Sequence, residues 1–518
     1  RGSGSLPYLF THQQILSFGQ LSLAPAASHI ITMANFSGIF LVAVTICAII
    51  TFLSSDFYKT KFKKAQETNA EDEISPEVKE RHTKLLKKYL FVYLLAVLSD
   101  WLQGPYVYAL YMEYGFEQHE IAELFVAGFG SSMVFGSFVG GMADSGGRRT
   151  FVIIFAAVYA ASCVTKHFKD YSILMLGRLL GGVATSLLFS VFEAWLIRAH
   201  ADAELPKSCL SKSFSWAAFS NSITAIFAGL VANNLANNST MTLVSGNIYV
   251  GGFLNPFDLA LAACGVCAAG AFMLWEENYG ERSSTDKEGR GDNNGQWYKA
   301  LQEAFGTTIN NRDVLLCGLI SSLFEGSMYI FVFCWTPLLK SFAGDSDLPF
   351  GLIFSTFMVS CMAGSSLFSI LVEQYPIERL AVVLFAFASV GMAIVGFGIN
   401  ESVSFVGMLF FEMCVGMYFP IMGTMKGGIV PENKRAAIYN LYRIPLNFIV
   451  LFSLLNDLTA SFSFKLNATM LAVATALQFV LTKRRLGTGN QSTSSPKEVE
   501  QQKPLLEEEM EDGGKHMV

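Results

Sequence analysis

Long apolar runs, separated by polar or charged stretches, dominate this chain of 518 residues. A helix rises about 1.5 Å per residue, so about 20 apolar residues are enough to cross the roughly 30 Å hydrocarbon layer of a bilayer. The pattern therefore predicts an all-α integral membrane protein with thirteen spans. Their approximate bounds are 36–54, 88–112, 120–143, 150–167, 171–197, 213–234, 256–275, 314–339, 351–373, 380–398, 403–429, 436–456 and 465–482.

Two polar stretches divide the predicted helices into groups. A charged linker follows the first helix, and a second polar stretch, expected to hold short amphipathic helices, separates the other twelve into six and six. The tail is rich in Ser, Gln and Glu and is predicted to be disordered. In chain order the predicted parts are 1–32, upstream or disordered; 33–55, an extra N-terminal transmembrane helix; 56–87, a cytoplasmic linker; 88–275, a six-helix bundle; 276–312, a cytoplasmic central loop; 313–482, a second six-helix bundle; and 483–518, a cytoplasmic tail.

The positions of Lys and Arg predict the orientation of the helices, because cytoplasmic loops retain basic residues. The less basic loops hold mainly Lys166, Lys169, Lys340 and Lys465, together with overlapping glycosylation sequons at 237–240. We therefore predict a multi-pass plasma-membrane protein with its N-terminus outside, an uncleaved first helix and its C-terminus in the cytoplasm. The basic loops on the predicted cytoplasmic side are marked by Lys59, Lys88, Arg148, Arg149, Arg198, Lys207, Arg379, Lys434 and Lys483.

The composition excludes several other classes of protein. Hydrophobic residues make up 52% of the chain and charged residues 15%, with a mean hydropathy of +0.41, so the bilayer is a predicted partner. The net charge of -6 offers no basic surface for nucleic acid. The nine cysteines lie mostly in apolar runs, and the seven histidines are scattered. We predict no disulfide framework, metal site or cofactor, and no enzyme, because the sequence has no nucleophile–base pair or phosphate-binding loop.

Acidic residues lie at matching depths in the first helix of each predicted bundle. Asp100 follows Lys88 by about twelve residues, and Glu325 follows Asp313 by about twelve. At about 1.5 Å per residue, both carboxylates lie roughly 18 Å into the membrane, near its midplane. Such a repeat, with its site between the two halves, is typical of secondary transporters.

The fourth helix of each predicted bundle repeats this pattern. Arg178 is followed by Gly182, and Glu412 is followed by Gly416 at the same spacing. A charge at the bilayer centre costs about 2.5–3.5 kcal/mol, so each charged side chain should face a cavity or a partner. The glycines themselves indicate close helix packing rather than contact with a ligand.

Arg443, Glu193 and Gln103, which is close to Asp100 in the sequence, complete the predicted substrate and ion pathway. Arg443 lies too deep in its helix to reach the aqueous phase easily, and Pro445 after it frees a backbone carbonyl. Glu193 lies near a helix end, where its side chain could instead extend to water. A purely structural alternative stays open, in which the acids only neutralise the arginines. The predicted pathway comprises Asp100, Gln103, Arg178, Glu193, Glu325, Glu412 and Arg443.

The stretch Gly140-x3-Asp144-x2-Gly147-Arg148-Arg149 resembles the signature between helices two and three of the major facilitator superfamily. The resemblance covers residues 88–482 and implies two six-helix bundles, a central cavity and alternating access. It also implies that Asp144 and Arg148 form a cytoplasmic latch against the eleventh core helix near residue 436. This sequence departs from the signature at residue 145, where the family often has a base.

Three longer strings, at 100–106, 177–195 and 331–337, resemble the eukaryotic molybdate-anion transporter branch of that superfamily. The resemblance implies import of molybdate, a tetrahedral dianion. Arg178 and Arg443 are the deep cations that could replace its hydration shell. Coupling to H+ or another cation is a hypothesis that rests on the buried acids.

Two alternatives remain open at this stage. A porter for a sugar-like or organic solute would use Asp100, Gln103 and Glu325 to bind hydroxyl groups, with the arginines only balancing charge. A nutrient sensor would signal through the linker and tail, and deleting 486–518 should then abolish signalling but spare ligand binding.

Overall fold

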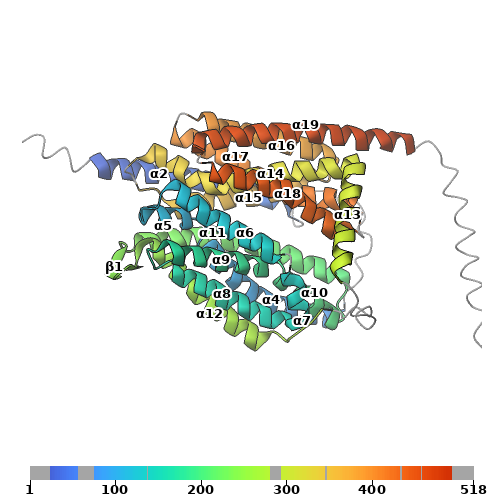
Figure 1. Ribbon diagram of the computed structural model, residues 1–518, viewed down its shortest axis with the longest axis horizontal. Helices are drawn as coiled ribbons and strands as arrows, with labels where there is room; N and C mark the ends of the chain where they lie inside the picture. The colour runs from blue at the N-terminus through green and yellow to red at the C-terminus, as the bar shows by residue number, and fades with distance from the viewer. Residues whose placement is uncertain are drawn as a thin grey trace, which may run out of the picture.

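The computed structural model describes residues 24–55, 75–136, 138–280, 293–344, 347–398, 400–431, 434–456 and 458–492. Residues 56–74 of the predicted linker 56–87, residues 281–292 of the central loop and residues 493–518 of the predicted tail 483–518 lie outside these ranges, as do residues 1–23. Within the described chain, helices are arranged in two neighbouring bundles whose axes run in roughly the same direction (Figure 1).

The first bundle holds the helices between the linker and the central loop, and α8 packs against both α9 and α12. In the second bundle α16 packs against α17 and α19, and α14 against α18. The extra N-terminal helix α2 (Ala24–Ser54) packs on α15 of the second bundle. The first bundle comprises α4 (Pro76–Trp101), α5 (Val107–Glu113), α6 (Gln118–Gly136), α7 (Val139–Gly146), α8 (Arg148–Thr165), α9 (Tyr171–Leu188), α10 (Val191–Asp202), α11 (Lys207–Asn237) and α12 (Asn255–Leu274). The second comprises α14 (Arg312–Ala343), α15 (Phe350–Leu371), α16 (Ile377–Phe397), α17 (Glu401–Ile429), α18 (Arg435–Leu455) and α19 (Ala460–Ser492).

The loop between α11 and α12 departs from the predicted all-helical structure. It forms a small antiparallel hairpin of β1 (Thr242–Ser245) and β2 (Ile248–Val250), followed by the short helix η1 (Gly252–Leu254). The predicted sequons directly precede β1. We call the end of the bundles that carries this hairpin the hairpin end, and the opposite end, where α13 lies, the linker end (Figure 1).

Ten described helices are long and apolar enough to cross a membrane, or eleven if α6 and α7, which meet at a bend of 53°, form one span. The sequence predicted thirteen. The predicted span 88–112 is divided between α4 and α5, because the chain turns at 102–106 around Gly104 and Pro105. In α18 only Leu441–Leu455 forms an apolar stretch, since polar residues occupy its first turns.

The repeated glycines lie where helices approach closely, as predicted. A Cβ atom on Gly182 of α9 would lie 1.9 Å from Ser131 Oγ and 2.2 Å from the Gly128 carbonyl of α6. A Cβ atom on Gly416 of α17 would lie 1.8 Å from the Cys361 carbonyl of α15. Backbone atoms cannot move aside as a flexible side chain can, so these two positions require glycine.

We expect Gly182→Ala to lower the stability of the folded protein by about 1–3 kcal/mol, the usual cost of overpacking. Gly130→Ala in the partner helix α6 is the control, because a Cβ atom on Gly130 meets nothing within 4 Å. The measurement is the thermal unfolding midpoint of each solubilised variant. Equal midpoints for the two variants would contradict the close approach of α6 and α9.

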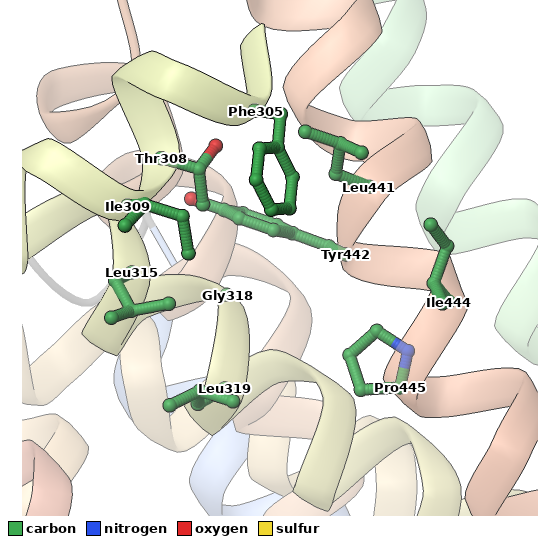
Figure 2. Close-up of a pocket in the computed structure, with 10 residues that line it drawn as sticks. All are labelled: Phe305, Thr308, Ile309, Leu315, Gly318, Leu319, Leu441, Tyr442, Ile444 and Pro445. Atoms are coloured by element: carbon green, nitrogen blue, oxygen red, sulfur yellow. The ribbon is translucent and has the colours of Figure 1, made fainter. Parts of the chain in front are cut away.

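The central loop contains the predicted amphipathic helix, α13 (Asn293–Asn310), which docks on the second bundle. Lys434 Nζ lies 3.3 Å from Glu303 Oε2 and 3.4 Å from Thr307 Oγ1. Figure 2 shows an apolar pocket of about 190 Å³ beneath this helix, into which the Tyr442 ring extends from α18. Gly318 makes room for that ring, and the Tyr442 hydroxyl donates to the Val314 carbonyl at 2.6 Å. Helix α13 of the central loop is thus anchored to the second bundle.

Candidate functional site

A cavity of about 780 Å³ lies between the two bundles. Its wall is formed mainly by α4, α6 and α9 of the first bundle and by α14 and α18 of the second. Both halves therefore contribute to it, as the predicted repeat requires. The structure brings together five of the seven predicted pathway residues in its lining: Asp100, Gln103, Arg178, Glu325 and Arg443.

The other two predicted pathway residues, Glu193 and Glu412, are not among the lining residues. Glu193 lies exposed in the first turn of α10, near the linker end. Glu412 is buried in α17, one turn before the Gly416 contact with α15. No hydrogen bond or ion pair of Glu412 is recorded in the described part of the chain.

Asp100 lies at the end of α4, where the chain turns, and its carboxylate faces the cavity. The Tyr159 hydroxyl of α8 donates a hydrogen bond to this carboxylate. The neighbouring Gln103 donates from Nε2 to the Ser99 carbonyl at 3.0 Å. The partner recorded for Asp100 is therefore a phenol, and no arginine is recorded as its partner within the described ranges.

Glu325 of α14 has two partners from α17. Lys426 Nζ lies 3.0 Å from its Oε1 atom, and the Tyr418 hydroxyl donates to the same oxygen at 2.8 Å. The Tyr418 ring stacks on Phe324 with centroids 4.0 Å apart, which holds the hydroxyl in place. Sequence reasoning missed Lys426 because it lies 101 positions along the chain from Glu325. Its charge neutralises that carboxylate.

The two predicted arginines lie at different depths along α6. The Arg178 guanidinium stacks on Phe125, 4.6 Å from the ring centroid, and lies 2.7 Å from a Cβ atom built on Gly128. Arg443 Nη1 reaches within 3.9 Å of a Cβ atom built on Gly136. Eight residues of helix separate these glycines, roughly 12 Å along the axis. An oxoanion beside Arg178 would therefore lie about two helical turns from Arg443.

Lys166 is a third cation in the cavity lining, and the sequence analysis placed it in an external loop. It caps the C-terminus of α8, and its side chain is only 1% exposed. The Tyr114 hydroxyl donates to its carbonyl at 2.7 Å, which fixes the backbone there. A count of charges per loop could not detect this, because the residue follows the last helical turn but points inward.

Aromatic rings from both bundles meet at the hairpin end, and several of them line the cavity. Examples are Trp101 with Phe354, at 5.9 Å between centroids, and Tyr108 with Phe333, at 5.4 Å. The same region contains further pairs between the bundles: Tyr106 with Phe350, Phe125 with Phe333, Phe129 with Tyr329, and Phe253 with Phe350. We call these contacts the aromatic seal.

The predicted gating motif lies at the linker end, between α7 and α8. Arg148 Nη2 lies 2.7 Å from Asp144 Oδ1, and Arg148 Nη1 donates to the Ala194 carbonyl at 3.0 Å. Gly147 has φ +98°, which favours glycine, and a Cβ atom there would collide with the Glu277 carboxylate. The hydrogen bonds recorded for the motif among the described residues stay within the first bundle. Gly140 and Arg149 lie on either side of this turn.

Glu277 is a residue of this region that the sequence analysis did not identify. Its carboxylate accepts hydrogen bonds from the backbone of Arg149 at 2.7 Å and of Thr150 at 3.1 Å. It therefore caps the N-terminus of α8, where an acid is stabilised by the helix dipole. The chain after α12 is thereby tied across the motif, which orders the turn without help from the second bundle.

Comparison with known proteins gives three findings. A family model described as sugar transporters with 12 transmembrane segments matches residues 40–418. The molybdate-anion transporters of Takifugu rubripes and Danio rerio are 33% and 34% identical over 388 and 391 residues, and each alignment covers 71% of this chain and 78% of the relative. The crystal structure of the nucleoside transporter NupG matches with a TM-score of 0.56 at 14% identity, over 77% of this chain and 99% of that chain.

Two helical bundles around a charged cavity, together with these matches, define a membrane transporter of the major facilitator type. The chain belongs to the family of 12-helix transporters whose model it matches, and it is a multi-pass membrane protein. The predicted fold class and the predicted resemblance to this superfamily and its molybdate-anion transporter branch are both confirmed.

Proposed function

We propose that this protein imports molybdate, or a closely related tetrahedral oxoanion, by alternating access. The observation that carries the proposal is the charge of the cavity. Arg178, Arg443 and Lys166 line it, whereas Asp100 is the one lining carboxylate among the described residues without a recorded basic partner. The excess positive charge suits a dianion, and guanidinium groups bind oxoanions through paired hydrogen bonds. The relatives named above support the same substrate.

We propose that the linker end is cytoplasmic and that the protein acts in the plasma membrane. The basic clusters around Arg148, Lys434 and Lys483 lie at this end, while the sequons lie at the hairpin end. The closed aromatic seal then faces outward. In this orientation the structure corresponds to a state closed to the outside, and the Asp144–Arg148 latch would engage α18 only in the opposite state.

We propose protons as the coupling ion. The Asp100 carboxylate faces the cavity and keeps its hydrogen bond from Tyr159. Protonation of this group would remove a negative charge from the cavity and lower the net charge carried with a dianion. The uptake assay below, repeated with a proton ionophore, tests this: uptake that is insensitive to the ionophore would rule out proton coupling but not transport.

We expect saturable molybdate uptake in cells that lack their own high-affinity system and express this chain. Tungstate and sulfate should compete, because both are tetrahedral dianions, whereas a neutral hexose should not. Uptake is measured against cells with an empty vector and against surface expression. No uptake by a well-expressed protein would overturn the oxoanion proposal. Competition by hexoses would favour the organic-solute porter, and ligand binding without uptake would favour the sensor.

A further inference from the structure

We propose that Lys166 and Arg178 together form the oxoanion site, and that Lys166 gives it a preference for dianions over monoanions. The inference rests on the proposed function and names the residues of that site. It differs from the sequence-based expectation, in which Arg178 and Arg443 share the substrate.

No acidic partner of the Lys166 ammonium is recorded in the part of the chain that the structure describes. Its Nζ atom is buried and has no hydrogen-bond partner among the described residues. The nearby carboxylate of Asp258 is instead paired with His167, at 3.0 Å. The Tyr111 ring, 5.6 Å away, offers a cation–π contact, and the hydroxyl of that tyrosine is also unpartnered. A buried charge without a partner is costly, and an anion bound in the cavity beside Lys166 would supply that partner.

Lys166 contacts the same turn of α9 that carries Arg178. A Cβ atom on Gly177, the residue before Arg178, would lie 3.3 Å from Lys166 Nζ. Tyr111 beneath the lysine is one turn from Tyr108, whose ring contacts Phe125 beneath Arg178 at 6.1 Å between centroids. The two cations therefore rest on one aromatic layer at the hairpin end of the cavity. Arg443 lies about two helical turns further along α6.

Together, Lys166 and Arg178 carry two positive charges, which match the two negative charges of a dianion. A single guanidinium balances only one of the two charges of a dianion, although it attracts the dianion more strongly than a monoanion of the same shape. A second cation at the same distance doubles the difference in Coulomb energy between the bound dianion and the bound monoanion. Because Lys166 is an ammonium, it acts as a point charge and adds little geometric selectivity of its own. The arginine would recognise the oxoanion shape and the lysine its second charge.

The test compares molybdate with perrhenate, a tetrahedral oxoanion that carries one charge. Uptake of molybdate and its inhibition by tungstate and by perrhenate are measured for the parent, Lys166→Met, Lys166→Arg and Lys169→Met at matched surface expression. Lys169 is the control because it is an exposed lysine three residues further on. We expect Lys166→Met to raise the half-saturating molybdate concentration about tenfold or more, with a much smaller change for perrhenate. Lys166→Arg should retain the preference, and Lys169→Met should match the parent.

A merely structural lysine would give a different result. Replacing an unpaired buried charge with an apolar side chain of similar length would then leave selectivity unchanged and stability equal or higher. That outcome, with the parent active, overturns this inference alone, whereas an inactive parent overturns the proposed function. If Lys166→Met does not reach the surface, Lys166→Gln is used. The thermal shifts that molybdate and perrhenate give to the solubilised protein then supply the same ratio.

Discussion

Replacing Arg178 with Met should raise the half-saturating molybdate concentration by about tenfold to a hundredfold, whereas Arg443→Met should mainly lower the maximal rate. A hydrogen bond from a charged group contributes about 1.5–3 kcal/mol, and about 1.4 kcal/mol corresponds to a factor of ten. Arg178 is placed for direct binding, on the Phe125 ring and beside Gly128. Arg443 lies nearer the linker end and would act on an anion that enters or leaves.

The control for both arginine variants is Arg379→Met, because Arg379 is exposed at the start of α16 and is not part of the cavity lining. The measurement is the concentration dependence of molybdate uptake at equal surface expression. Arg178→Lys should recover part of the affinity, since the charge returns without the paired donors. Parental kinetics in both Met variants would show that the arginines are structural and that the anion is held elsewhere.

Lys426→Met should lower the stability of the folded protein by about 3 kcal/mol, the scale for breaking a buried ion pair by removing one partner. The side chains of Lys426 and Glu325 are 19% and 27% exposed, so the pair is mostly shielded from water. Without the lysine, the Glu325 carboxylate keeps only the Tyr418 hydrogen bond. The double variant Glu325→Gln with Lys426→Met should regain most of the lost stability, because no charge is left unpaired.

Thermal unfolding of the parent, the two single variants and the double variant completes this cycle, and uptake by the double variant separates structure from transport. A stable double variant that still concentrates molybdate would limit the pair to a structural role. A stable double variant that equilibrates molybdate without concentrating it would assign Glu325 to coupling. Additive effects of the two single changes would contradict the ion pair itself.

The depth of charges in the sequence predicted many of the charged residues that line the cavity. Asp100, Arg178, Glu325 and Arg443 were expected near the midplane, and all four line the cavity. The sequence could place these residues at a cavity because a charge in an apolar helix must face an aqueous space or a partner, whichever helix carries it. Glu412 meets the same criterion but lies outside the lining, because depth alone does not say which side of a helix faces the cavity.

The partners of these residues could not be predicted from the sequence. Tyr159 and Tyr418 look like ordinary aromatic residues in apolar helices, and only the packing brings their hydroxyls to Asp100 and Glu325. Lys166 was missed for another reason. It follows α8 directly, and the counting of loop charges assigns such a residue to solvent whatever the direction of its side chain.

The aromatic seal and the anion site should respond differently to salt. Dissolved ions screen charge–charge attraction, but they have little effect on contacts between apolar rings. The barrier built from pairs such as Tyr108 and Phe333 should therefore hold equally well in dilute and in saline media. Capture of an anion by Arg178 should weaken as salinity rises. A change in the surrounding medium would thus reduce how often the carrier is loaded, without making it leak.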